Sequence, residues 1–332
     1  MKTNFYKARK ILIVRLSSLG DVLLTLPVLG ALKREFPEKN FSFVVNKQYS
    51  DAVKFHPALN SIFEYDRDNP ETTIEKLLAE KFDFIIDLQN NRRSSKIVKS
   101  LGAPVRVFKK PDLKKFLLVH FKLNLFDEIK SVPELYASAA EPALKVNYDD
   151  FEFFLPERKA KHVPEKKKIC FCPGAQHFTK RYPTDYFTEL GRMLQRDGFE
   201  IHLLGGKADK EICGEISAAL SGAENKSTDD DLFALAREFE TCAVAVCNDS
   251  GLMHLASAVG TPVIALFGSS VREFGFAPFS RKSLLLENNS LSCRPCSHVG
   301  RPKCPKEHFK CMLELKPKYV YEKFTEFYKA NV

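Results

Sequence analysis

Residues 11–33 read ILIVRLSSLGDVLLTLPVLGALK, and this stretch decides the fold class. It opens with a short β-branched apolar run, Ile11–Val14, followed by a Ser-Gly-Asp turn. An apolar segment with helical periodicity then runs from Val22 to Phe36 and ends at Pro37. This order is typical of a strand, a loop and a helix. We therefore expect it to be the first βα step of a parallel sheet.

The same alternation extends along the chain in two series. In the first, apolar runs at 41–45 and 82–88 alternate with helical stretches at 72–80 and 93–101. A second series has expected strands at 169–172, 200–204, 243–247 and 262–267, again separated by helical segments. Between them, RKAKHVPEKKK at 158–168 is charged and has almost nothing to bury, which is typical of a domain boundary. The sequence predicts an α/β protein of two Rossmann-like, doubly wound domains.

Composition excludes several classes of protein. The 332 residues are 44% hydrophobic and 28% charged, which excludes a disordered or fibrous chain. The longest apolar stretch, Val22–Leu32, is about half of the ~20 residues that a bilayer span needs. Because the N-terminus also lacks a clean apolar core, we expect a cytosolic protein. Nine cysteines in a reducing compartment are interpreted as buried apolar residues or metal ligands rather than disulfides.

Positive charge is concentrated in the first half. Residues 1–162 hold 28 basic and 21 acidic side chains, and residues 92–122 hold ten basic side chains against the single acid Asp112. Apolar residues at 116–121 lie inside this basic run, a pattern that favours a phosphorylated lipid or an anionic membrane surface. Nucleic acid would attract the same charges. A solvated basic face with its apolar residues in the core is the plainer alternative.

Polar loops follow the expected strands, where ligands of parallel α/β sheets bind. Two such domains facing each other would form a cleft with a donor on one side and an acceptor on the other. Asp249, Ser250 and Gly251 precede a helix, so free backbone amides there form an anion site suited to a diphosphate. Asp249 or Ser250 is equally well explained as a helix N-cap. His254 lies in the same helix, where packing is the alternative role.

A long loop follows the first strand of the second domain. Gly174 would allow close backbone approach, and Thr179 and Lys180 lie further along, where Lys180 would neutralise a leaving phosphate. The alternative is an ordinary surface loop. Neither GxxxxGK[ST] nor a GxGxxG after a strand is present, so phosphate binding here would need another architecture.

Asp21 closes the loop after the first strand and opens the following helix. It would serve as a general base, although a helix N-terminus also stabilises a carboxylate and weakens it as a base. Ser17, Ser18 and Gly20 would supply hydrogen bonds to an acceptor or a phosphate.

Four cysteines near the C-terminus form C-x2-C-x7-C-x6-C: Cys293, Cys296, Cys304 and Cys311. Four thiolates in this order could close a structural zinc tetrahedron. The alternative is a reduced or redox-sensitive cluster that packs a proline-rich loop. A catalytic zinc is not expected, because the cluster lies far in sequence from the other candidate loops.

Together these segments resemble the ADP-heptose:lipopolysaccharide heptosyltransferase family. The resemblance rests on ILIVRLSSLGDVLLTLPVLGALK, FDFIIDLQNNRRS, PGAQHFTKRYP, NDSGLMHLASAVGTPVIALFGSS and the cysteine-rich tail, in this order over almost the whole chain. The tail looks more like that of heptosyltransferase II-like members. The resemblance implies a GT-B fold with an acceptor domain at 1–162, a nucleotide-sugar domain at 163–315, and a final helix at 316–332 returning to the first domain.

The resemblance also implies roles for individual residues. Asp21 would be the base of an inverting, metal-independent transfer, and Lys180 would stabilise the departing diphosphate. The nucleotide sugar would be bound by Gly174, Thr179, Lys180, Asp249, Ser250, Gly251, His254 and Gly268, and the acceptor by Ser17, Ser18, Gly20, Arg92 and Arg93.

The implied function is transfer of a heptose from ADP-heptose to the inner core of a phosphorylated lipopolysaccharide precursor. The reaction would take place at the cytosolic face of the inner membrane, where the protein would be peripheral. No cofactor is required for catalysis, and no nucleic-acid partner is expected. Two alternatives remain: a related transferase for another nucleotide sugar or surface glycan, and a silent protein that binds glycolipid or nucleotide sugar.

Overall fold

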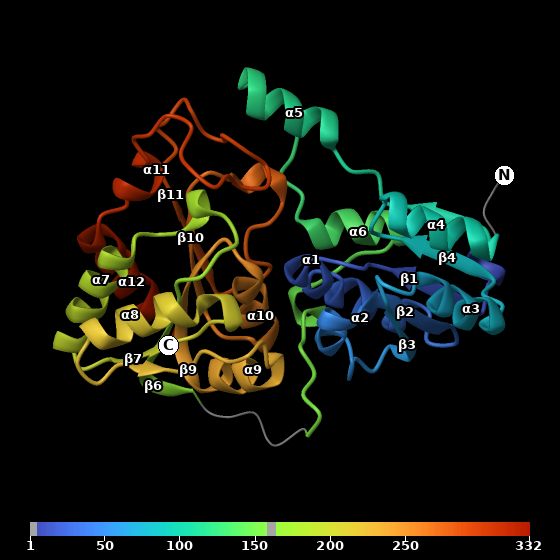
Figure 1. Ribbon diagram of the computed structural model, residues 1–332, viewed down its shortest axis with the longest axis horizontal. Coiled ribbons are helices and arrows are strands. Elements are labelled where there is room, and N and C mark those ends of the chain that lie inside the picture. The colour runs from blue at the N-terminus through green and yellow to red at the C-terminus, as the bar shows by residue number, and fades with distance from the viewer. Residues whose placement is uncertain (1–4, 158–163) are drawn as a thin grey trace. The chain divides into compact units, whose positions relative to one another are not determined.

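A computed structural model describes residues 5–157 and 164–332, and these divide into two compact units (Figure 1). Unit 1 comprises Met1–Lys110 and Val132–Pro156, and unit 2 comprises Pro111–Ser131 and Glu157–Val332. The expected boundary at 162/163 lies outside the described residues.

Unit 1 is built on a five-stranded sheet with the order β3-β2-β1-β4-β5, and all its strand pairs are parallel. The strands are β1 (Lys10–Val14), β2 (Asn40–Asn46), β3 (Leu59–Tyr65), β4 (Phe84–Asp87) and β5 (Val105–Val107). Residues 11–14 of β1 are all buried. A continuous apolar strand forms here because a central parallel strand is covered on both faces.

The helices of unit 1 follow the strands in sequence. They are α1 (Leu19–Leu23), α2 (Leu26–Glu35), α3 (Pro70–Glu80), α4 (Arg92–Leu101) and α6 (Val132–Ala140). The predicted single helix at 22–36 is two helices, α1 and α2, which meet at Leu24 and Thr25. The Thr25 hydroxyl donates to the Val22 carbonyl oxygen within this junction.

Unit 2 contains a six-stranded sheet with the order β11-β10-β9-β6-β7-β8, again parallel throughout. Its strands are β6 (Glu165–Cys172), β7 (Glu200–Leu203), β8 (Glu224–Asn225), β9 (Cys242–Asn248), β10 (Val263–Phe267) and β11 (Ser283–Glu287). The predicted α/β class with two parallel, doubly wound sheets is confirmed.

The helices of unit 2 are α5 (Asp112–Phe121), α7 (Thr184–Arg196), α8 (Lys210–Ala219), α9 (Leu232–Thr241), α10 (Gly251–Val259), α11 (Lys310–Leu313) and α12 (Pro317–Asn331). The expected return of the final helix to the first domain needs correction. Val320, Phe324 and Phe327 of α12 are buried in the core of unit 2, and α12 packs along α7. These three positions form one apolar stripe along the helix, and this stripe is buried in the core of unit 2.

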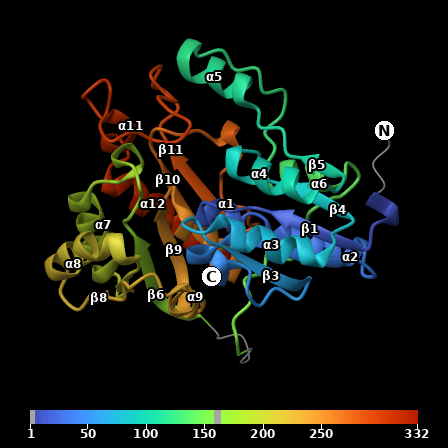
Figure 2. The same cartoon turned by 45° about the vertical axis from the view of Figure 1, so that its right-hand side comes forward.

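Unit 2 also includes residues 111–131, which were expected to belong to the first domain. Its helix α5 contributes Leu118 and Val119 to a small apolar cluster with Val271 and Phe274. In both views α5 lies apart from the sheet of its unit (Figures 1 and 2). Within the described residues, no helix has the length and apolar character needed to cross a membrane.

Candidate functional site

Each sheet has a point where the strand order reverses. In unit 1 the chain winds outward from β1 through β2 to β3 and then resumes at β4, beside β1. In unit 2 it winds from β6 to β8 and resumes at β9, beside β6. Loops diverge at such a switch point and leave a crevice at the carboxyl ends of the strands. The candidate residues cluster at these two points, and each is described within its own unit.

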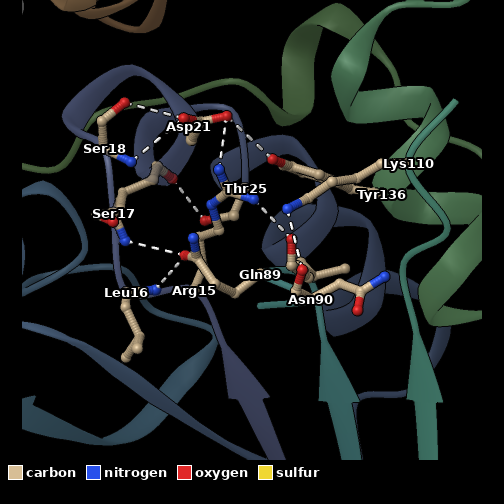
Figure 3. A network of polar contacts seen from close by, with 12 residues as sticks. Arg15, Leu16, Ser17, Ser18, Asp21, Thr25, Gln89, Asn90, Lys110 and Tyr136 are labelled. Atoms are coloured by element: carbon tan, nitrogen blue, oxygen red, sulfur yellow. Dashed lines mark hydrogen bonds and ion pairs between the residues drawn. The ribbon is translucent and has the colours of Figure 1, made fainter. Parts of the chain in front are cut away.

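Asp21, in the first turn of α1, is held by donors on both carboxylate oxygens (Figure 3). Oδ1 lies 2.7 Å from Nη2 of Arg15 and accepts a 3.3 Å hydrogen bond from the Tyr136 hydroxyl. Oδ2 accepts from the backbone N–H of Ser18 at 3.2 Å and from its hydroxyl at 2.9 Å. Among the residues that the structure describes, Ser18, which is exposed, is the one that holds Oδ2.

Electrostatics keep this carboxylate ionised. Burial raises the pKa of Asp21, but the Arg15 guanidinium and the Ser18 hydrogen bonds outweigh that effect and leave the pKa below its usual value. Arg15 is itself fixed, because Nη1 donates to the Leu88 carbonyl oxygen at 2.7 Å and the guanidinium lies 5.4 Å from the Tyr136 ring centroid. The arrangement therefore presents a carboxylate that is ionised at neutral pH.

Gln89 ties the loop after β4 to the loop after β1. Its Oε1 accepts from the backbone N–H of Leu16 at 2.9 Å and of Ser17 at 3.1 Å (Figure 3). The buried Asp87 accepts from the N–H of Gln89 and Asn90, both at 2.9 Å, and from the Ser94 hydroxyl at 2.8 Å. The unit 1 switch point is thus a connected polar network.

A basic cavity of about 540 Å³ lies at the start of α4. Arg92, Lys96 and Lys99 line it, and Asn91 caps the helix by accepting from the N–H groups of Arg93 and Ser94. Arg93 is not among the residues that line this cavity. Of the two expected acceptor-binding arginines, Arg92 is therefore the one that faces it.

In unit 2, Lys180 and Asp249 form an ion pair with Nζ and Oδ2 2.8 Å apart. The Ser270 hydroxyl also donates to Asp249 Oδ2. Asn248 locks the same loops together, because its Oδ1 accepts from the N–H of Tyr182 at 2.9 Å and its Nδ2 donates to the Pro173 carbonyl oxygen at 2.7 Å. The predicted residues Lys180 and Asp249 are brought together.

Helix α10 begins at Gly251 with Ser250 as its N-cap residue. Within the described residues, the buried Ser250 Oγ has no hydrogen-bond partner, and the same holds for the Ser269 Oγ. A capping serine normally accepts from the helix backbone. Here that cap is missing, which leaves the first amides of α10 available to an anion. His254 is buried in the same helix.

Two of the predicted glycines are closely packed, and Gly268 meets backbone that cannot move aside like a side chain. A Cβ on Gly174 would lie 2.1 Å from the Asp209 carboxyl carbon, and one on Gly268 would lie 2.6 Å from the Thr179 carbonyl oxygen. Thr179 accepts on that oxygen from the N–H of Ser269 at 3.1 Å. The loops after β6 and β10 are therefore in direct contact through Thr179.

Arg294, inside the CRPC segment, organises the loop after β10. Its Nε donates to the Gly268 carbonyl oxygen at 2.6 Å, and its Nη2 donates to the Ser270 carbonyl oxygen at 2.7 Å. Nη2 also lies 2.8 Å from Oε2 of Glu287, and both side chains are buried. Arg294 thereby sets the position of Ser270, which donates to Asp249.

The four C-terminal cysteines do not support the expected structural zinc. Within residues 5–157 and 164–332, no group of three or more His, Cys, Asp or Glu side chains is arranged to hold a metal ion. Cys293 Sγ lies 3.8 Å from His308 Nε2, and burial raises the pKa of the Cys311 thiol to about 12. Such a thiol stays protonated at neutral pH and packs as an apolar group.

Several residues of the two networks were missed at the level of sequence. Arg15 and Gln89 carried a usable signal, because each is polar and directly follows a buried strand. Arg294 lies between Cys293 and Cys296, whose spacing indicated a metal site and gave no sign of a role for the arginine. Tyr136 gave no signal, because it reaches Asp21 from a helix 115 residues away.

Comparisons with known proteins identify the family of this chain. Residues 72–306 match the model of glycosyltransferase family 9 (heptosyltransferase). The chain is 25% identical over 328 residues to lipopolysaccharide heptosyltransferase 1 of Pseudomonas aeruginosa, covering 92% of this chain and 91% of that protein.

Two solved structures share the fold. The ADP-heptose lipopolysaccharide heptosyltransferase II of E. coli superposes with a TM-score of 0.73 at 21% identity, over 97% of this chain and 99% of that one. The E. coli heptosyltransferase WaaC with ADP-2-deoxy-2-fluoro heptose gives 0.69 at 19% identity, over 95% and 99%. The expected GT-B fold is confirmed.

Proposed function

The chain belongs to glycosyltransferase family 9, the heptosyltransferase family, and from this membership we propose that it transfers a heptose from ADP-heptose to the inner core of a phosphorylated lipopolysaccharide precursor. The donor is suggested by WaaC, which was solved with an ADP-heptose analogue. The acceptor is suggested by the relatives' names, which include both heptosyltransferase 1 and heptosyltransferase 2. We place the reaction at the cytosolic membrane face, where such an acceptor would be reached.

In this proposal Asp21 is the general base. It takes the proton of the acceptor hydroxyl while that oxygen attacks the anomeric carbon, and ADP leaves from the opposite face with inversion. We assign proton acceptance to Oδ2, because Oδ1 is occupied by Arg15 and Tyr136. The Ser18 hydroxyl on Oδ2 can rotate away and make room for the acceptor hydroxyl. Ser17 and Gly20 belong to the same segment, and we assign them to acceptor binding.

The donor half stabilises the departing diphosphate. Lys180 supplies a positive charge, and we assign hydrogen bonds to the diphosphate to the backbone amides of Ser250 and Gly251 at the N-terminus of α10. Thr179 and Gly268 fix the loop that carries Lys180, and Gly174 keeps the backbone close to Asp209. His254 completes the pocket from within α10. This charge stabilisation needs no metal ion.

The acceptor carries phosphates or carboxylates, and the basic cavity at the start of α4 suits such groups. Arg92 supplies a planar fork for bidentate contacts, while Lys96 and Lys99 act as point charges. Arg93 does not line the cavity, and we assign it to the acceptor side only as a neighbouring positive charge. Lys96 is paired with Glu71 at 2.5 Å, so an acceptor anion would compete with that carboxylate.

The observation that carries the proposal is the ionised Asp21 carboxylate held at the unit 1 switch point. The test is a transfer assay with ADP-heptose and a lipid-linked precursor, followed by determination of the anomeric configuration of the product. Activity that persists in excess chelator, with inverted configuration, is the expected result. A calorimetric screen of ADP-, UDP- and GDP-sugars should show preference for ADP; preference for another nucleotide would contradict the proposed donor.

A further inference from the structure

We propose that α5 and the segment after it, residues 112–129, form an anchor whose outer side chains insert into an anionic lipid surface. The inference rests on the proposed function only in that a membrane-bound acceptor gives such an anchor its purpose. It goes further by identifying which part of the chain enters the lipid.

One face of α5 is fixed to unit 2. Leu118 and Val119 are buried against Val271 and Phe274, and Lys115 lies over the rings of Phe274 and Phe276 at 5.8 and 5.4 Å. Lys115, Leu118 and Val119 are spaced i, i+3 and i+4, so they share a single side of the helix. That side is the inner one.

The opposite side presents large apolar residues to solvent. Leu113 is 70% exposed, Phe116 is 51% exposed and Phe121 is 67% exposed. Leu113 and Phe116 are one turn apart on the helix, and the Phe116 and Phe121 rings lie 6.0 Å apart. These residues therefore form one continuous apolar surface.

The apolar surface continues past the end of the helix at Leu123, Leu125 and Ile129, all of them exposed. Within the described residues, six of the sixteen exposed large apolar side chains thus fall within residues 113–129. Scattered exposed apolar residues need no explanation, but a concentration of this kind marks an interaction site.

The C-terminal end of α5 is anchored rather than loose. Lys122 donates from Nζ to the carbonyl oxygens of Val119 at 2.8 Å, Cys293 at 3.1 Å and Pro295 at 2.6 Å. The cysteine-rich loop therefore acquires a role as the support of α5. A supported helix can insert its outer face without losing its own structure.

Charge decides which partner fits this surface. The anchor and the residues that flank it, 109–130, hold six lysines against the three acids Asp112, Asp127 and Glu128, which leaves a net positive charge. A second copy of the chain would bring the same positive charges against this face, and like charges would repel. Anionic lipid headgroups attract them, and the acyl region accepts the apolar side chains. An anionic bilayer is therefore the partner that satisfies both features.

The chain contains no tryptophan, which provides a direct test. Phe116→Trp introduces a single fluorophore on the outer face, and Tyr319→Trp introduces one at an exposed position of α12 as the matched control. With vesicles of phosphatidylcholine and phosphatidylglycerol, the Phe116→Trp emission should shift to shorter wavelength and be quenched by brominated acyl chains. The control should show neither effect. Absence of both effects at Phe116→Trp would overturn the anchor.

A second measurement concerns affinity. Combined Leu113→Ser, Phe116→Ser and Phe121→Ser should weaken vesicle partitioning at least about 50-fold, because three large apolar side chains no longer enter the lipid. Leu78→Ser, at an exposed position of α3, should leave partitioning unchanged. Equal partitioning of the triple variant and the wild type would overturn the proposal. Another outcome would also overturn it: the wild type forms a dimer, and the triple variant loses this dimer but still binds vesicles.

The anchor and the proposed function can fail separately. With a soluble saccharide acceptor lacking acyl chains, the triple variant should transfer heptose at the wild-type rate. If neither protein transfers heptose but partitioning still falls in the triple variant, the anchor stands and the proposed function is wrong.

Discussion

Each switch point holds one ion pair between a basic side chain and a carboxylate. The two pairs differ in which side chain is the more exposed. In unit 1 the Arg15 side chain is 6% exposed and its partner Asp21 is 20% exposed. In unit 2 the carboxylate is the deeper member, since Asp249 is 6% exposed and Lys180 is 17% exposed. The first site therefore presents a carboxylate and the second an ammonium group.

This reversal teaches how one fold can serve two chemical needs. A buried charge is costly unless it is paired, and each inner partner here offsets the desolvation of its outer partner. The outer carboxylate is suited to accepting a proton, and the outer ammonium group is suited to holding a leaving anion. The same βα loop architecture supplies both.

The largest expected effect comes from neutralising the outward carboxylate. Asp21→Asn keeps the size of the side chain but removes its charge, so turnover should fall at least about 100-fold. Initial rates of ADP release measure the change. Asp51→Asn, at an exposed carboxylate elsewhere in unit 1, should retain wild-type turnover. Unchanged turnover in Asp21→Asn would remove this residue from the mechanism.

The next effect concerns the outward cation. Lys180→Met should lower kcat/KM about 100-fold, as expected for loss of one preorganised donor. It also leaves Asp249 buried without its cation, which should cost about 3 to 5 kcal/mol of stability. The measurements are steady-state kinetics and chemical denaturation.

A double variant separates the two consequences. Lys180→Met with Asp249→Asn removes both charges and should recover most of the lost stability without recovering activity. Recovery of both would mean that Lys180 acts only by pairing with Asp249.

A smaller effect is expected at Arg294. Arg294→Lys keeps the charge but cannot make the planar set of contacts to Gly268, Ser270 and Glu287. We expect nucleotide affinity to fall roughly tenfold and stability to fall by about 2 kcal/mol. Calorimetric titration with ADP and thermal denaturation measure the two changes. An affinity like that of the wild type would show that the loop keeps its position without this fork.

The smallest expected effect is a displacement in pH. Because the pKa of Asp21 is lowered, its ionised form persists below the usual carboxyl range, and its contribution to stability is lost only as pH falls through that lowered value. Arg15→Gln removes the main opposing charge, so burial then raises the pKa of Asp21. The acidic limb of the kcat/KM profile should move up by about one pH unit. An unmoved limb would assign it to another group.

The strand and helix order was predictable, because apolar runs and periodic segments report directly on burial. The same holds for the residues placed at strand ends, since Lys180 and Asp249 meet because the sheet order makes β6 and β9 neighbours. The break between α1 and α2 was missed, although Thr25 at the N-cap and Pro27 in the first turn of α2 are typical signals of a helix start.

Pairing across long separations was beyond the sequence pattern. The contact between Tyr136 and Asp21 depends on how α6 packs, and the burial of α12 in unit 2 depends on the stripe that α7 offers it. The cysteine spacing suggested a zinc site that the structure does not support, because ligand spacing is only one requirement for such a site. The side chains must also converge, and within the described residues they do not.

The most direct test of the reversed charge pairs is the affinity for ADP, measured by calorimetry in Asp21→Asn and Lys180→Met. Our account predicts that Asp21→Asn binds ADP within about twofold of the wild type, because its carboxylate acts on the acceptor. Lys180→Met should bind at least about tenfold more weakly, because its ammonium group acts on the diphosphate. Weaker binding in Asp21→Asn together with wild-type affinity in Lys180→Met would contradict the division of roles between the two switch points.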